Sequence, residues 1–174
     1  NNAVQDGYDL YQQYFILSDE GEWTGISQGM NTRTRRARRY HWHSPSVKSF
    51  LNDPHKAIVG QRPGKILNLA DERADLTREN IVSLTKENPK EVLDEFRGLT
   101  LPNHHDIRES DINMKRLGAI LYNVYETGID NFEDLLMLKG VGPKTLRSLS
   151  LVSEVVHGDS SRFDDPARFS FAVG

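Results

Sequence analysis

Two glycines, a proline, a lysine and a threonine interrupt an otherwise apolar run in "LLMLKGVGPKTLRSLSLV", residues 135–152. Glycine adopts backbone angles that are closed to other residues, and proline fits the first position of a helix, where no amide hydrogen is needed. The pattern therefore predicts a helix that begins at residues 142–143. The amides and dipole of a helix start favour an anion, and the lysine and threonine add a cation and a hydroxyl. We expect one backbone phosphate to be held here by Gly140, Val141, Gly142, Lys144 and Thr145.

A second basic feature, "RTRRARR" at residues 33–39, holds five arginines and no acidic residue. Asn31 is a suitable cap for a helix over residues 32–43. Such a helix predicts a basic stripe of Arg35, Arg36, Arg39 and Trp42 on one face. Clustered arginines neutralise phosphates, and a tryptophan stacks on an exposed base. The alternatives are a solvated charged face and arginines paired with acidic helices of the same chain.

Histidines suggest two places for a metal ion. On the predicted helix His41 and His43 would lie about 200° apart, so they would not share one ion. His104, His105 and Asp106 form a second candidate metal site, with ordinary loop polar groups as the alternative. No spacing identifies the converging carboxylates of a metal-dependent nuclease. We therefore expect no cofactor in this segment, with a divalent metal in a longer protein as the alternative.

The elements that must position these residues begin with a β-hairpin over 11–28, where apolar runs flank the turn sequence "SDEGE". Residues 54–65 contain glycine and proline and predict a loop. Helical patterns follow as far as residue 157. Asn88 and Asn131 are suitable helix caps, and Gly128 is a suitable helix end.

These elements predict a mainly α (α+β) fold, in which an N-terminal β-hairpin precedes a helical bundle. Residues 1–65 would hold the hairpin and the basic helix, and residues 66–174 the helical region. We expect the two parts to form one compact domain.

The composition narrows the possible classes of protein. The 174 residues carry a net charge of −3 and include no cysteine, which excludes disulfides and thiolate metal sites within the chain. No window approaches 18 consecutive apolar residues, so we expect no membrane span and a cytoplasmic setting. Because the chain begins at Asn1 rather than at a methionine, we expect a piece of a longer protein.

The stretch from Leu138 to Thr145 resembles the helix-hairpin-helix family of DNA-binding motifs, whose core reads apolar–x–Gly–apolar–Gly–x–x–Thr. The motif would span residues 131–157. Leu146 stands where the family often has alanine. The resemblance implies contact with nucleic-acid backbone without sequence specificity. A helix hairpin without a ligand is the alternative.

The same resemblance implies a further alternative, because bifunctional base-excision glycosylases carry a lysine two residues after the second glycine of this motif. Lys144 stands at that position and would form a Schiff base with an abasic sugar. Those enzymes also use an aspartate near the end of the following helix. Asp159, Asp164 and Asp165 lie in that stretch.

Four stretches along the chain together resemble the prokaryotic domain of unknown function 763 proteins: "NNAVQDGYDLYQQYFILSDEGEW", "QGMNTRTRRARRYHW", "LKGVGPKTLRSLSLVSEVVHG" and "DDPARFSFAVG". The resemblance covers nearly the whole chain and corresponds to the C-terminal half of longer proteins. It implies an association with DNA processing or repair, such as a nuclease whose N-terminal part is absent here. A structural or protein-interaction module remains the other hypothesis.

Overall fold

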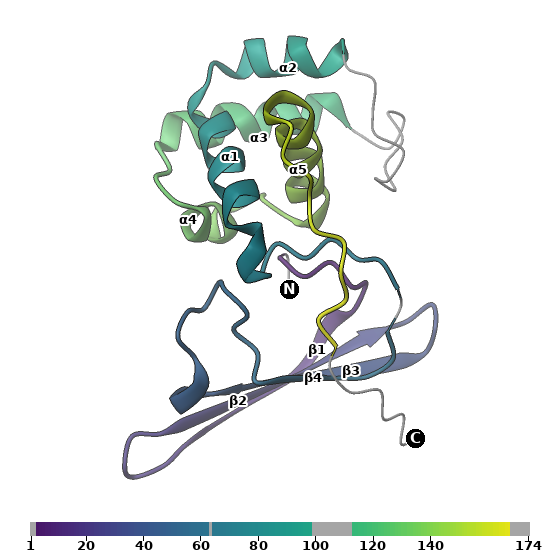
Figure 1. The fold of residues 1–174 in the computed structure, drawn as a ribbon, viewed down its shortest axis with the longest axis vertical. Coiled ribbons are helices and arrows are strands. Elements are labelled where there is room, and N and C mark those ends of the chain that lie inside the picture. The colour runs from purple at the N-terminus through teal and green to yellow at the C-terminus, as the bar shows by residue number, and fades with distance from the viewer. Residues whose placement is uncertain (1–2, 63, 99–112, 168–174) are drawn as a thin grey trace. The chain divides into compact units, whose positions relative to one another are not determined.

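The computed structural model describes residues 3–62, 64–98 and 113–167, and within these ranges the chain folds as two compact units (Figure 1). The first unit contains Ala3–Glu72 together with the segment that begins at Arg162. The second unit contains Arg73–Ser161. A short 3-10 helix, η1 (Ser44–Ser46), lies in the first unit, and η2 (Glu72–Ala74) precedes the helices of the second.

The first unit is built on a four-stranded antiparallel sheet, ordered β1 (Asp9–Leu17), β2 (Trp23–Asn31), β3 (Arg36–His43) and β4 (Ala57–Val59). β1 and β2 form the hairpin that the sequence predicts. Its turn is closed by a backbone hydrogen bond from Ser18 N to Glu22 O (2.8 Å). The β-hairpin prediction is therefore confirmed.

The helix predicted over residues 32–43 is wrong, because this segment forms a turn followed by β3. Asn31 does accept a backbone hydrogen bond, from Thr34 N at 3.0 Å, but it closes a turn in which Arg35 has φ +56°. β3 then pairs with β2 in continuous register from Asn31↔Arg36 to Thr24↔His43. The long-range ladder outweighs the local helix signal.

The mainly α prediction is also wrong, because a four-stranded antiparallel sheet accompanies the helices and the fold is α+β. The predicted loop at 54–65 supplies a strand of this sheet, since Ala57–Val59 pairs with β3 as β4. Three residues between glycine and proline signals are too few to show a strand periodicity, and the partner strand decides their conformation.

The second unit contains five helices within the described ranges: α1 (Asp75–Lys86), α2 (Pro89–Arg97), α3 (Met114–Thr127), α4 (Phe132–Met137) and α5 (Pro143–His157). α1 packs against α3, α4 and α5, and α2 packs against α3. Leu84, Leu121, Leu135, Leu146 and Leu149 are among the buried side chains that form the core. In the described part of the chain, no helix is long and apolar enough to cross a membrane.

Local signals set several ends of these helices. The predicted caps Asn88 and Asn131 are confirmed, because their side chains accept hydrogen bonds from Lys90 N (3.0 Å) and Asp134 N (2.9 Å). Gly128 ends α3 in the left-handed conformation, with φ +69°, as predicted.

Candidate nucleic-acid interface

The chain between α4 and α5, which we call the α4–α5 turn (Leu138–Gly142), reverses through two different glycine conformations. Gly140 has φ +97°, which favours glycine, whereas Gly142 is extended with φ −132°. Between them Val141 is buried, and its N–H donates to Leu138 O at 3.1 Å. Among the described residues, a Cβ added at either glycine would meet no atom within 4 Å.

The start of α5 differs from the starts of α2, α3 and α4. Those three helices are capped by the side chains of Asn88, Asn113 and Asn131. The N-cap of α5 is Gly142, and no side chain of the described residues caps its amides. Pro143 occupies the first turn, which contains no acidic residue. The first turn of this 15-residue helix therefore supplies no acidic side chain of its own to offset the positive end of the helix dipole.

The side chains that follow the turn separate into exposed and buried groups. Lys139 and Lys144 are exposed. Thr145 is buried, with 6 % of its surface exposed. Lys144 is therefore the side chain of this Lys-Thr pair that α5 exposes to solvent. The arrangement can attract an anion through a lysine, a helix dipole and uncovered glycine backbone.

Lys144 and Asp159, two of the residues proposed for glycosylase chemistry, lie near opposite ends of α5. Lys144 lies at the start of α5 and Asp159 beyond its end, roughly 20 Å away at the rise of an α-helix. Asp159 instead accepts a hydrogen bond from Thr77 Oγ1 at 2.7 Å. Asp164 and Asp165 belong to the first unit, whereas Lys144 belongs to the second.

The predicted basic stripe is divided by the strand that replaces the predicted helix. Side chains alternate between the two faces of β3, so Arg36 and Trp42 share a face with Tyr40, and Arg39 lies on the opposite face. Arg35 precedes the strand in the turn. All three of these arginines are exposed.

His41 and His43 also share one face of β3, contrary to the helix-based expectation. Burial lowers the pKa of His41, and His43 Nδ1 lies 3.3 Å from Thr24 Oγ1. Within the described ranges no three histidine or acidic side chains form a metal-ion cluster. His104, His105 and Asp106 lie outside the described residues.

Arg38, the fourth arginine of the basic segment, is fully buried in the first unit and forms an ionic cluster. It donates to Asp6 Oδ2 at 3.0 Å, to Asp165 Oδ2 at 2.8 Å and to the carbonyl of Gln61 at 2.5 Å. Burial opposes its charge, but the hydrogen bond to Asp165 and the charge of Asp6 outweigh this effect and raise the pKa of Arg38. The cluster leaves Arg38 unavailable to a ligand.

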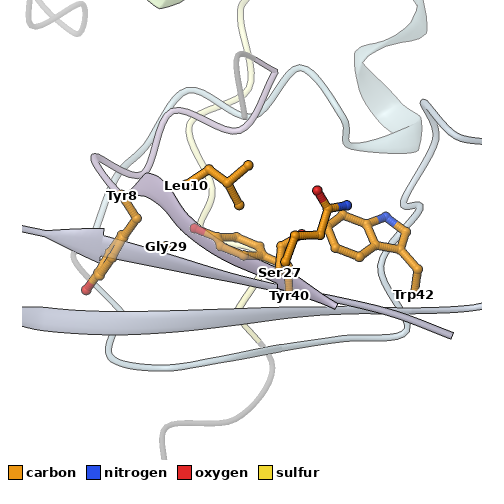
Figure 2. Close-up of a pocket in the computed structure, with 7 residues that line it drawn as sticks. Tyr8, Leu10, Ser27, Gly29, Tyr40 and Trp42 are labelled. Carbon is orange, nitrogen blue, oxygen red and sulfur yellow. The ribbon is translucent and has the colours of Figure 1, made fainter. Parts of the chain in front are cut away.

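A pocket of about 230 Å³ lies on the Tyr40 side of the sheet (Figure 2), and of its lining residues only Trp42 was predicted from the sequence as a binding residue. Figure 2 shows Tyr40 between Tyr8 and Trp42. We call this cavity the sheet pocket; its lining is Tyr8, Leu10, Gln13, Ser27, Gly29, Tyr40 and Trp42. The small residues at alternate positions of "GISQG" (25–29) were the available sequence signal, because they leave one strand face without large side chains.

The pocket walls are fixed by close packing. A Cβ added at Gly29 would lie 2.8 Å from Tyr8 Cβ and 3.2 Å from Tyr40 Cε2, so glycine allows both tyrosines to approach β2. The His55 ring packs against Trp42, and the two ring centroids are 4.7 Å apart. Burial lowers the pKa of His55 to about 4, so this side of the pocket is uncharged at neutral pH.

Comparison with known proteins identifies a protein family. A family model described as "Protein of unknown function (DUF763)" matches residues 1–174. No curated protein and no solved structure shows a significant match.

Proposed function

The chain belongs to the DUF763 family of proteins of unknown function, and because that membership assigns no activity, we propose a function from the α4–α5 turn. We propose that this turn is part of a helix-hairpin-helix motif, and that it binds the phosphate backbone of DNA without sequence specificity. The observation that carries the proposal is the start of α5, where a glycine N-cap without a side chain is followed by the exposed Lys144.

Charge and access both favour a phosphate at the start of α5. A phosphate at the start of α5 gains from the helix dipole and from Lys144, and Gly140 and Gly142 place no side chain in its way. Such a contact reads no base edge, so it favours binding to any sequence. Binding of this kind suits the part of a DNA-processing protein that holds the phosphate backbone of its DNA substrate.

Catalysis by Lys144 receives no support from the geometry. The lysine is exposed rather than enclosed in an apolar pocket, and Asp159 lies at the other end of α5. We therefore propose a phosphate-binding lysine.

The test compares Lys144→Ala with Lys90→Ala, because α2 offers a matched helix start. Lys90 also follows a proline in the first turn and is also exposed, but its helix is capped by the Asn88 side chain. We expect Lys144→Ala to weaken binding to every duplex sequence and to reduce the slope of log affinity against log salt by about one. Fluorescence anisotropy with labelled duplexes of two unrelated sequences, over a salt series, measures both quantities.

Lys90→Ala should leave affinity and salt slope at the wild-type values. Circular dichroism of both variants checks that the helices are intact. Equal losses in the two variants would indicate a general charge effect, and an unchanged Lys144→Ala would contradict the proposal.

A further inference from the structure

We propose that the sheet pocket binds an unpaired base of single-stranded nucleic acid, and that the arginine-rich β2–β3 turn contacts the adjoining phosphates. This inference concerns the first unit and does not depend on the α4–α5 turn, which belongs to the second. It assigns the chain a base-binding site in addition to a backbone-binding one.

The shape and walls of the pocket suit a flat heterocycle. At about 230 Å³ the cavity is smaller than the 300 to 1,000 Å³ typical of sites for drug-sized ligands. Three of its seven lining residues are aromatic: Tyr8, Tyr40 and Trp42. Bases stack on such side chains regardless of sequence, because every base has a π-face.

Polar groups in the pocket are available for the edge of a base. Ser27 has only 6 % of its surface exposed, yet its side chain lines the cavity. Within the described part of the chain, neither the Ser27 hydroxyl nor the Gln13 amide has a side-chain hydrogen-bond partner. A hydroxyl and an amide can each donate and accept, so they suit the mixed donors and acceptors of a base. A purely apolar ligand would leave both groups unsatisfied.

The basic residues lie at the end of the sheet that adjoins the pocket. Gly29, in the pocket floor, is two residues from Asn31, where the β2–β3 turn begins. Arg36 is on the pocket face of β3, with its Cα roughly 13 Å from that of Tyr40 at the rise of a strand. Exposed Arg33 and Arg35 stand in the turn itself. A base in the pocket would thus place its flanking phosphates within reach of long cationic side chains.

Tryptophan fluorescence offers a readout that is local to this site. Trp23 and Trp42 are the two tryptophans of the chain. Trp23 stacks with Phe15 and with Phe50, at distances between ring centroids of 5.7 Å and 6.0 Å, so Trp23→Phe keeps an aromatic ring there. Trp42 is then the sole reporter, and stacking of a base in the pocket quenches its emission.

The experiment titrates the full chain carrying Trp23→Phe with the oligonucleotide dT20, an abasic oligonucleotide of the same length, and the mononucleotide dTMP. We expect dT20 to quench Trp42, the abasic strand to leave it unquenched, and dTMP to bind far more weakly because it lacks neighbouring phosphates. Adding Lys144→Ala should leave the quenching by dT20 in place, which separates this site from the α4–α5 turn.

Two pairs of variants test the residues while sparing the fold. Gln13→Ala, on the pocket face, should weaken quenching by dT20 about two- to tenfold, whereas Gln12→Ala, on the opposite face of β1, should not. Arg36→Ala should reduce the salt slope by about one, whereas Arg39→Ala should not. All four side chains are exposed, so these substitutions should be tolerated.

Three results would overturn the proposal. The first is the absence of quenching by dT20 at low salt. The second is equal quenching by the abasic strand, which would mean that phosphates bind without a base. The third is dTMP binding as tightly as dT20, which would make the site one for free nucleotides.

Discussion

The arginines of "RTRRARR" have different roles because neighbouring residues of β3 differ in burial and in the face of the sheet on which they lie. Arg38 is enclosed by Asp6 and Asp165 and is fully buried, whereas Arg36 and Arg39 are exposed on opposite faces of the sheet. Tyr40 joins the same cluster by donating its hydroxyl to Asp6 Oδ2 at 2.5 Å. Burial and the neighbouring Asp6 raise the pKa of Tyr40, so it stays a donor.

Removing the Arg38 charge should cost far more stability than removing an exposed one. Arg38→Met would leave two buried carboxylates without their cation, a loss of about 3–5 kcal/mol in the free energy of unfolding. Arg39→Met, one residue further along β3, should change stability by less than about 0.5 kcal/mol. Urea unfolding followed by tryptophan fluorescence measures both. Similar values for the two variants would mean that the cluster is not stabilising.

At the scale of elements, the α4–α5 turn shows how two glycines of one motif serve different ends. Gly140 is required by its backbone conformation, because φ +97° is strained for other residues. Gly142 is extended, so its lack of a side chain matters for access to the start of α5 rather than for the fold.

Alanine at these two positions should therefore give different results. Gly140→Ala should destabilise the second unit by roughly 1–2 kcal/mol, measured by urea unfolding followed by circular dichroism. Gly142→Ala should cost less than about 1 kcal/mol but should weaken duplex binding, because a methyl group stands where the phosphate approaches. If Gly142→Ala bound duplex DNA with wild-type affinity, the role of Gly142 in backbone access would be wrong.

At the scale of the whole molecule, the first unit is assembled from both ends of the described chain. Asp6 and Asp165 meet on Arg38, and Asn68 N donates to Arg162 O at 2.9 Å. Leu67 also bridges to Phe163. The second unit, Arg73–Ser161, lies between these segments in the sequence.

Ending the chain at Ser161 should consequently unfold the first unit and spare the second. The truncation removes Asp165 and leaves Arg38 and Asp6 without one partner of their cluster. We expect the tryptophan emission to shift to the red, since both tryptophans are in the first unit, while the circular dichroism of the helices persists. Native tryptophan emission in the truncated chain would contradict this assembly.

The features that could be predicted from the sequence depend on interactions between residues close together in the chain. The hairpin at 11–28, the caps Asn88 and Asn131 and the helix end at Gly128 each depend on neighbours a few residues away. The α4–α5 turn belongs to this group, because its glycines and Pro143 act locally. Val141 is buried within it.

The strand β3, the buried Arg38 and the sheet pocket depend on the tertiary structure, because the residues that contact each other there are distant in the sequence. The Asn31 side chain accepts a hydrogen bond from Thr34 N, which is the contact that it would also make at the start of a helix. Only the pairing of β3 with β2 makes the following segment a strand. Arg38 and Asp165 are 127 residues apart, so no local pattern separates this buried arginine from its exposed neighbours. The sheet pocket likewise combines side chains of β1, β2 and β3, whose shared face exists only once the strands are paired.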